Sequence, residues 1–198
     1  MAKRLIDVLL ATLGLVILAP VLLAAMAWVR LDSPGPVLFR QERVGQHGSV
    51  FRIHKLRTMS ITAGAQGPAI TAQNDPRVTR AGRWLRRYRI DELPQLIDVI
   101  RGDMSLVGPR PEVPRFVALY PPELRARVLS VRPGITDPAA LEFVDESALL
   151  AGSEDPERTY VEAILPRKLI RQVAYAERAT WASDLAVLAR TLRVLIAR

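Results

Sequence analysis

Two adjacent carboxylates, Asp91 and Glu92, are the residues of this sequence best suited to do chemistry. They follow a strongly basic run at 86–89, and Pro94 comes two residues after them. Proline is well tolerated in the first turn of a helix, where its missing N–H is not needed. Apolar residues then recur at helical spacing up to Gly102. The sequence therefore predicts that Asp91 lies at or beside a helix N-cap.

Two interpretations of this pair stay open on the residues alone. In the first, Asp91 only caps the helix, as aspartate often does, and Glu92 pairs with an arginine. In the second, Asp91 is a carboxylate nucleophile at a helix N-terminus, where backbone N–H groups and the helix dipole also attract phosphate. The two interpretations differ in whether a phosphorylated ligand binds here.

Several cations are placed where they could meet such a ligand. Lys55 follows directly after a predicted strand, where ligand contacts are common. Arg110 stands between Pro109 and Pro111, and Arg132 precedes a Pro-Gly pair. A guanidinium held by a stiff backbone is suited to bidentate contact with phosphate. Two such positions in one chain favour a polyanionic ligand.

The composition points in the same direction. The 198 residues carry a formal charge of +8, which suits nucleic acid, an anionic membrane surface or a phosphorylated substrate. The absence of cysteine excludes disulfides, thiol catalysis and cysteine-based zinc sites. The two histidines, His47 and His54, offer at most a poor metal site. The basic stretch at 80–87 has no further nucleic-acid recognition motif, so we expect no nucleic-acid partner.

The segment from Leu5 to Val29 is almost wholly apolar and would form a helix of about 37 Å, long enough for a bilayer of about 30 Å. Pro20 lies inside it and predicts a kink. Both flanks are basic, so the positive-inside rule is best satisfied if both ends stay on the cytoplasmic side, as in a re-entrant helix. A spanning anchor is the alternative. Asp7, one turn from Arg4, is expected to lie with it at the membrane interface.

The remaining elements follow from alternation, turns and caps. Residues 37–54 predict a β-hairpin, and 60–74 a loop long enough to be functional. Thr79 is expected to cap a short helix. Residues 112–120 and 122–130 predict two more helices. Asp155-Pro156 begins another, which Pro166 is expected to break, and Ser183 or Asp184 opens the last. That last helix suits either the core or the membrane surface.

Taken together, several stretches resemble the small monotopic phosphoglycosyl transferases among the bacterial sugar transferases. The resemblance runs from about Lys3 to the last helix and is highly specific in the order and spacing of its motifs. The family usually has Ser-Pro where this chain has Ala19-Pro20, and this chain departs from the family again at 137–143. The stretches that carry the resemblance are 3–7 with the apolar segment and Pro20, Lys55-Leu56-Arg57-Thr58-Met59, 75–80, Asp91-Glu92-Leu93-Pro94-Gln95-Leu96, 101–111 and Val131-Arg132-Pro133-Gly134-Ile135-Thr136.

The resemblance implies a membrane enzyme that moves a phospho-sugar from a nucleotide diphosphate sugar, usually a UDP-sugar, to polyprenol phosphate and releases UMP. It implies Asp91 as the nucleophile of a ping-pong reaction and Glu92 beside it. The cofactor implied is Mg²⁺, held through Asp91 or Glu92. By position in the family pattern, the phosphates would be bound by Lys55, Arg86, Arg110 and Arg132.

The expected fold is α/β, mostly helical with a small β-hairpin. Residues 1–30 would form a re-entrant helix with its break at Pro20, and residues 31–198 a catalytic domain with interfacial amphipathic helices. The expected place is the cytoplasmic face of the bacterial inner membrane, among its lipids, and a homodimer is left open. The rival hypothesis is a membrane-tethered basic scaffold, or a nucleic-acid-binding module, in which Asp91 is only a cap.

Overall fold

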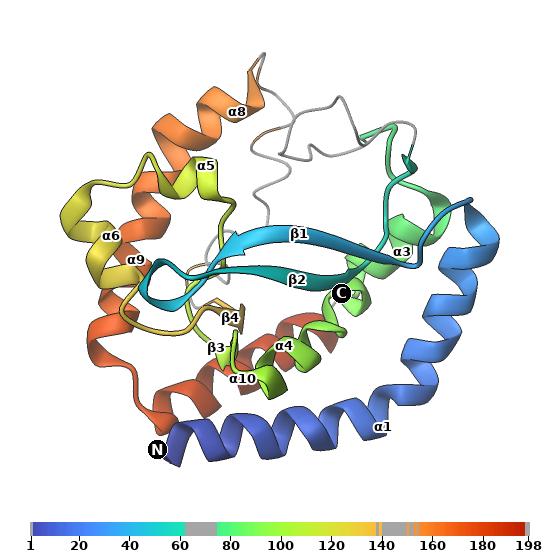
Figure 1. Ribbon diagram of the computed structural model, residues 1–198, viewed down its shortest axis with the longest axis horizontal. Helices are drawn as coiled ribbons and strands as arrows, with labels where there is room; N and C mark the ends of the chain where they lie inside the picture. The colour runs from blue at the N-terminus through green and yellow to red at the C-terminus, as the bar shows by residue number, and fades with distance from the viewer. Residues whose placement is uncertain are drawn as a thin grey trace.

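The protein is seen in a computed structural model that describes residues 2–61, 75–137, 139, 150, 153 and 155–196. It is mostly helical, with two small two-stranded sheets (Figure 1). The elements are α1 (Ala2–Asp32), β1 (Leu38–Val44), η1 (Gln46–Gly48), β2 (Val50–Leu56), α3 (Arg80–Arg87), η2 (Ile90–Glu92), α4 (Gln95–Arg101), β3 (Ser105–Val107), α5 (Pro114–Val117), α6 (Pro122–Val128), β4 (Gly134–Thr136), α8 (Pro156–Thr159), η4 (Tyr160–Ile164), α9 (Leu165–Arg178) and α10 (Trp181–Ile196).

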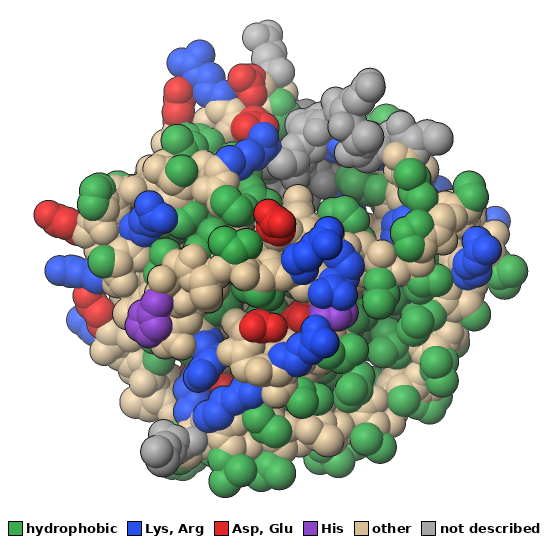
Figure 2. All heavy atoms as spheres, in the orientation of Figure 1, with side chains coloured by type: hydrophobic (Ala, Val, Ile, Leu, Met, Phe, Trp, Pro, Cys, Tyr) green, Lys and Arg blue, Asp and Glu red, His purple; other side chains and the backbone are tan. Residues whose placement is uncertain are grey.

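The first helix, α1, has 31 residues and remains helical on both sides of Pro20. Among the described helices it is the one long and apolar enough to cross a membrane. An 18-residue stretch of it has a mean hydropathy of 2.7, and 17% of that stretch is buried. Figure 1 shows that α1 changes direction along its length, and Pro20, which lacks an N–H, is a physical cause for this. Hydrophobic side chains line the lower and right edges of the molecule along α1 (Figure 2). This helix fits a membrane anchor.

The N-terminal end of α1 is fastened to the rest of the protein by polar contacts. The Arg4 guanidinium donates to the carbonyl of Val99 at 2.5 Å, near the end of α4. Asp7 is buried and accepts a hydrogen bond from Ser105 Oγ at 2.8 Å. The expectation that Asp7 lies with Arg4 at a membrane interface is therefore wrong. The hydrogen-bond donors to this buried carboxylate lie in β3, and Lys3 Nζ lies 3.9 Å from its Oδ2.

The predicted hairpin is confirmed. Strands β1 and β2 pair antiparallel, from Leu38 opposite Leu56 to Val44 opposite Val50. The second strand extends two residues beyond the predicted end. Lys55 consequently lies inside β2, opposite Phe39, and the strand ends directly before Arg57.

A second sheet, which the sequence pattern did not predict, brings the Gly108-Pro109 and Pro133-Gly134 stretches together. Strands β3 and β4 pair in parallel, with Ser105 opposite Gly134. The backbones approach so closely that a Cβ on Gly134 would lie 2.0 Å from the backbone N of Gly108. Glycine is therefore required at this crossing. The segment that carries Arg110 leaves from this rigid junction.

Two predicted helix caps are confirmed, whereas the predicted break at Pro166 and the predicted start of the last helix are wrong. Thr79 caps α3 by accepting from Gly82 N, and Asp155 caps α8 by accepting from Arg158 N. Pro166 does not break the chain's helical path, because the π turn η4 precedes it and proline then occupies the first turn of α9. The last helix begins at Trp181 rather than at 183 or 184. Most of the predicted loop at 60–74 lies outside the described residues.

The hydrophobic core joins α1 to the elements that carry the predicted site residues. In its N-terminal half, Ala11 packs with Ile53 of β2 and Leu96 of α4. In its C-terminal half, Val29 packs with Leu56 of β2 and Leu85 of α3. The same helix therefore supports β2, α3 and α4, between which the carboxylate pair lies.

Candidate active site

The carboxylate pair lies in the short 3-10 turn η2 that follows α3. Arg89, at the start of this turn, has a positive φ of 58°, a conformation that is strained for a side chain of this kind. Asp91 is 1% exposed and Glu92 is 5% exposed. The N-cap of α4 is Pro94, so the prediction that Asp91 lies at or beside the cap is wrong by one short turn. The carboxylates face cations instead of capping a helix.

Asp91 has one oxygen paired and one oxygen without a partner. Its Oδ2 lies 2.9 Å from Lys55 Nζ. Its Oδ1 is buried, and within the described parts of the chain no hydrogen-bond donor reaches it. A buried acceptor without a donor is rare in folded proteins and carries a free-energy penalty of about 1–3 kcal/mol. Such an atom is suited to a ligand, a metal ion or a reacting phosphorus.

Glu92 is held by three cations. Its Oε1 accepts from Arg110 Nη2 at 2.6 Å and lies 3.3 Å from Lys55 Nζ, while Oε2 is 3.1 Å from Arg89 Nη1. Burial alone would raise the pKa of Glu92. Arg110, Lys55 and Arg89 outweigh burial and hold that pKa well below its ordinary value of 4.5. Glu92 is therefore ionised, and it fixes two of the predicted phosphate-binding side chains.

Arg86 lies on α3, and its charge interacts with those of Asp91 and Glu92. Its Nε donates to Thr58 Oγ1 at 2.8 Å, just after the end of β2. Burial lowers the pKa of the Arg86 guanidinium, and the charge of Asp91 acts in the opposite direction. Thr58 therefore sets the direction of Arg86, and Asp91 is close enough to interact with its charge.

Arg110 is positioned through its backbone as well as its side chain. Its N–H donates to Asp137 Oδ2 at 3.1 Å, and the same carboxylate accepts from Gln172 Nε2 at 2.6 Å. Burial raises the pKa of Asp137, partly offset by the hydrogen bond from Gln172. Asp137 begins the stretch in which this sequence departs from the phosphoglycosyl transferase pattern, and here it holds Arg110 in place.

The structure does not bring Arg132 to the carboxylate pair. Its Nε donates to the carbonyl of Gly102 at 2.9 Å, just beyond the C-terminal end of α4, whereas Asp91 precedes the N-terminal end of that helix. A seven-residue helix is about 10 Å long. The pairing of β3 with β4 explains this, since it uses the Arg132 segment to hold the Arg110 segment.

Three residues that shape the site were not predicted from the sequence. Arg89 was visible only as part of the basic run, Thr58 only as part of a matching motif, and Asp137 only as a departure from it. Thr58 and Asp137 each bond to an arginine that is far away along the chain, and Arg89 reaches Glu92 through a strained turn. Sequence spacing carries no signal for such contacts.

The site has an excess of positive charge that suits a diphosphate. Two carboxylates face four cations, which are Lys55, Arg86, Arg89 and Arg110. In the described ranges, no group of three or more His, Asp or Glu side chains forms a ready metal cage. Mg²⁺ commonly uses one or two carboxylates together with substrate phosphates. The unpaired oxygen of Asp91 fits that mode, whereas both oxygens of Glu92 are already engaged.

Comparison with known proteins agrees with this chemistry. The family described as bacterial sugar transferase matches residues 1–198. The UDP-glucose:undecaprenyl-phosphate glucose-1-phosphate transferase of Caulobacter vibrioides is 41% identical over 199 residues, which cover 98% of this chain and 69% of that protein.

Two further relatives match over shorter stretches. The putative undecaprenyl-phosphate N-acetylgalactosaminyl 1-phosphate transferase of Bacillus subtilis is 46% identical over 122 residues, which are 62% of this chain and 68% of that protein. The UDP-glucose:undecaprenyl-phosphate glucose-1-phosphate transferase of Escherichia coli is 44% identical over 136 residues, which are 68% of this chain and 29% of that longer protein.

Proposed function

Because this chain belongs to the bacterial sugar transferase family and is a sugar-phosphate transferase, we propose that it moves a sugar 1-phosphate from a UDP-sugar to a polyprenol phosphate. The products are UMP and a polyprenol diphosphate sugar. A glycan of the bacterial surface would then be built on this lipid carrier.

The observation that carries the proposal is the state of Asp91. It is a buried carboxylate with one oxygen lacking a hydrogen-bond donor in the described structure, set among side chains that suit a diphosphate. An Asp91 that only capped α4 would accept hydrogen bonds from that helix, and the N-cap is Pro94 instead. The arrangement supports a nucleophile rather than a cap.

In the first step, a carboxylate oxygen of Asp91 attacks the β-phosphorus of the UDP-sugar. The new bond joins this oxygen to phosphorus, and the bond between the β-phosphorus and the bridging oxygen breaks, so UMP leaves with that oxygen. An ionised carboxylate needs no base to activate it. Lys55, Arg86 and Arg110 bind the phosphate oxygens and stabilise the charge that develops on them.

In the second step, an oxygen of the polyprenol phosphate attacks the same phosphorus and releases Asp91 as a carboxylate. The reaction is ping-pong, and one phosphate site serves both halves. Glu92 positions Lys55 and Arg110 through both steps. Asp91, together with the donor's phosphates, would hold Mg²⁺, which when bound neutralises phosphate charge.

The membrane location belongs to the same proposal. The apolar helix α1 keeps the enzyme at the bilayer that contains its lipid acceptor. Basic residues at both ends and the bend in the helix favour a re-entrant path with its break at Pro20. The catalytic part would then face the cytoplasm at the inner membrane, where UDP-sugars are available.

The proposal is tested by UMP release in the presence of Mg²⁺ and undecaprenyl phosphate. UDP-glucose and UDP-N-acetylgalactosamine head the donor panel because relatives carry these sugars in their names. We expect one donor to give UMP and Asp91→Asn to abolish it while leaving the thermal unfolding midpoint close to that of the wild type. A folded, membrane-bound wild type that releases UMP from no UDP-sugar would contradict the proposal.

A further inference from the structure

We propose that Arg57 is a positioning residue that fixes the exit of α1 to the strand carrying Lys55, and so sets the height of the active site above the membrane. The inference rests on the proposed function, because it concerns how a lipid acceptor reaches that site. It assigns a role to a buried cation that takes no part in the chemistry described above.

Arg57 binds the end of α1 through its guanidinium. Nη2 donates to the carbonyl of Val29 at 3.1 Å and to that of Ser33 at 2.6 Å, and Nη1 donates to the carbonyl of Pro34 at 2.8 Å. The residue is 5% exposed. Carbonyls at the C-terminal end of a helix lack partners within the helix, and a cation there is favourable for the helix dipole. One side chain therefore satisfies three carbonyls where α1 ends.

The turn that follows α1 is shaped around this guanidinium. Gly35 has a positive φ of 119°, and a Cβ at that position would lie 2.3 Å from Arg57 Nη1. The backbone N–H of Arg57 also donates to the carbonyl of Val37 at 2.8 Å. Side chain and main chain together fasten this exit to the end of β2, two residues from Lys55.

A second contact joins the same end of α1 to α3. Asp32, the last residue of α1, accepts from the backbone N of Ala81 at 2.9 Å and so satisfies an N–H in the first turn of α3. In addition, Gly82 lies against the carbonyl of Thr58, where a Cβ would come within 2.1 Å. Because α3 carries Arg86, two of the phosphate-binding side chains stand on elements bonded to the end of the membrane helix.

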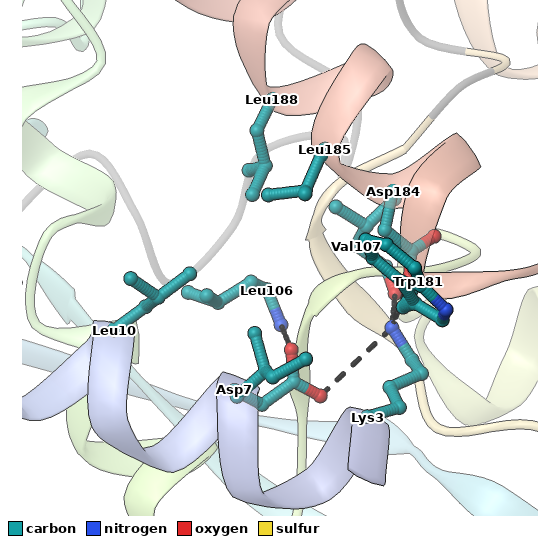
Figure 3. Close-up of a pocket in the computed structure, with 10 residues that line it drawn as sticks. Lys3, Asp7, Leu10, Leu106, Val107, Trp181, Asp184, Leu185 and Leu188 are labelled. Atoms are coloured by element: carbon teal, nitrogen blue, oxygen red, sulfur yellow. Dashed lines mark hydrogen bonds and ion pairs between the residues drawn. The ribbon is translucent and has the colours of Figure 1, made fainter.

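The opposite end of α1 is also fastened, around a small pocket between α1 and α10 (Figure 3). Lys3 forms an ion pair with Asp184 of α10, and Tyr175 donates to the same carboxylate at 2.6 Å. Asp7 accepts from the backbone N of Leu106 at 3.3 Å. A helix held at both ends cannot tilt without moving the elements that carry the site.

The two substrates differ in how they depend on this connection. The UDP-sugar is soluble and can approach from water at any height. The phosphate of a long polyprenol stays at the headgroup level of the bilayer, so the site must be held at that level. A misplacement of about 1 Å can lower a rate by about 100-fold. Loosening the exit of α1 should therefore impair transfer to a membrane acceptor more than transfer to a dispersed one.

The test compares two acceptors with the full-length protein. One is undecaprenyl phosphate in phospholipid vesicles, and the other is a short-chain prenyl phosphate in detergent micelles. We expect Arg57→Gln to lower transfer to the first by about tenfold and to leave transfer to the second within about twofold. Arg57→Lys, which keeps a cationic donor, should recover part of the loss. Arg158→Gln, in an exposed pair with Glu162, is the matched control.

A second variant keeps the inference testable if Arg57→Gln does not fold. Asp32→Ala removes the contact with α3 and should show the same difference between the two acceptors. An equal loss with both acceptors, or no loss with either, would overturn the inference. Failure of the wild type with both acceptors would instead refute the proposed function on which it rests.

Discussion

Replacing Arg110 with glutamine should weaken catalysis, stability and tolerance of acid together. Arg110 makes the shortest of the three cation contacts to Glu92, at 2.6 Å. Without this charge, the pKa of Glu92 rises from its lowered value. A carboxyl group with a lowered pKa stabilises the fold at pH values above its ordinary pKa of 4.5. This stabilisation is lost as the pH falls through the folded-state pKa. In the variant, the folded-state pKa lies closer to 4.5, so less of this stability is present and its loss is complete at a higher pH.

The size of the stability loss depends on the cation contacts that Glu92 keeps in the variant. A hydrogen bond to a charged group contributes about 1.5–3 kcal/mol to stability. Lys55 at 3.3 Å and Arg89 at 3.1 Å remain on the buried carboxylate. We therefore expect a loss near the lower end of that range, about 1.5 kcal/mol. Because one donor to the transferring phosphate is also removed, kcat should fall by about 100-fold to 1,000-fold.

The assay is UMP release against pH, with denaturant unfolding measured at pH 7 and at about pH 4, below the ordinary pKa of the carboxyl group. The control is Arg115→Gln, which breaks an Arg–Glu pair at 3.0 Å whose side chains are 50% and 38% exposed. Such an exposed pair contributes at most about 1 kcal/mol, and its loss should leave the pH profile unchanged. This role of Arg110 is refuted if Arg110→Gln leaves the acidic limb of the activity profile where it is in the wild type, or if it costs no more stability than the control.

Three further outcomes are expected. Thr58→Val keeps the side-chain shape but removes the acceptor of Arg86 Nε, so KM for the donor should rise by about tenfold, and an unchanged KM would show that Thr58 does not orient Arg86. Gly134→Ala forces a Cβ to within 2.0 Å of the backbone N of Gly108 and should destabilise the fold by about 3 kcal/mol in denaturant unfolding; wild-type stability would argue against the close crossing. Chelation of Mg²⁺ should reduce UMP release to background and its re-addition should restore activity, whereas activity that persists in chelator would remove the metal from the proposal.

The sequence predicted those features that depend on neighbouring residues. The apolar helix, the hairpin and the caps at Thr79 and Asp155 each have a local signal in composition, alternation or spacing. The carboxylate pair and Arg110 stood out for the same reason. In the structure, Lys55, Arg86 and Arg110 do gather around Asp91 and Glu92.

The remainder depends on contacts between distant segments. Strands of three residues, such as β3 and β4, are too short to show alternation, so their pairing and the resulting position of Arg132 could not be foreseen. The hydrogen-bond donors to Asp7 lie about a hundred residues away in β3. Asp91 was expected at or beside the N-cap of α4 because aspartate followed by proline and a helical pattern usually marks a helix start, but an extra 3-10 turn separates it from α4.

In the proposed reaction Asp91 forms a covalent bond to the phospho-sugar, and this bond can be trapped. The full-length protein is mixed with Mg²⁺ and a UDP-sugar labelled at the β-phosphate, without acceptor, and the labelled peptide is located by mass spectrometry. We expect about one label per enzyme on Asp91, its removal when undecaprenyl phosphate is added, and none in Asp91→Asn. A covalent intermediate would be contradicted if the wild-type enzyme released UMP only when the acceptor was present and never carried the label.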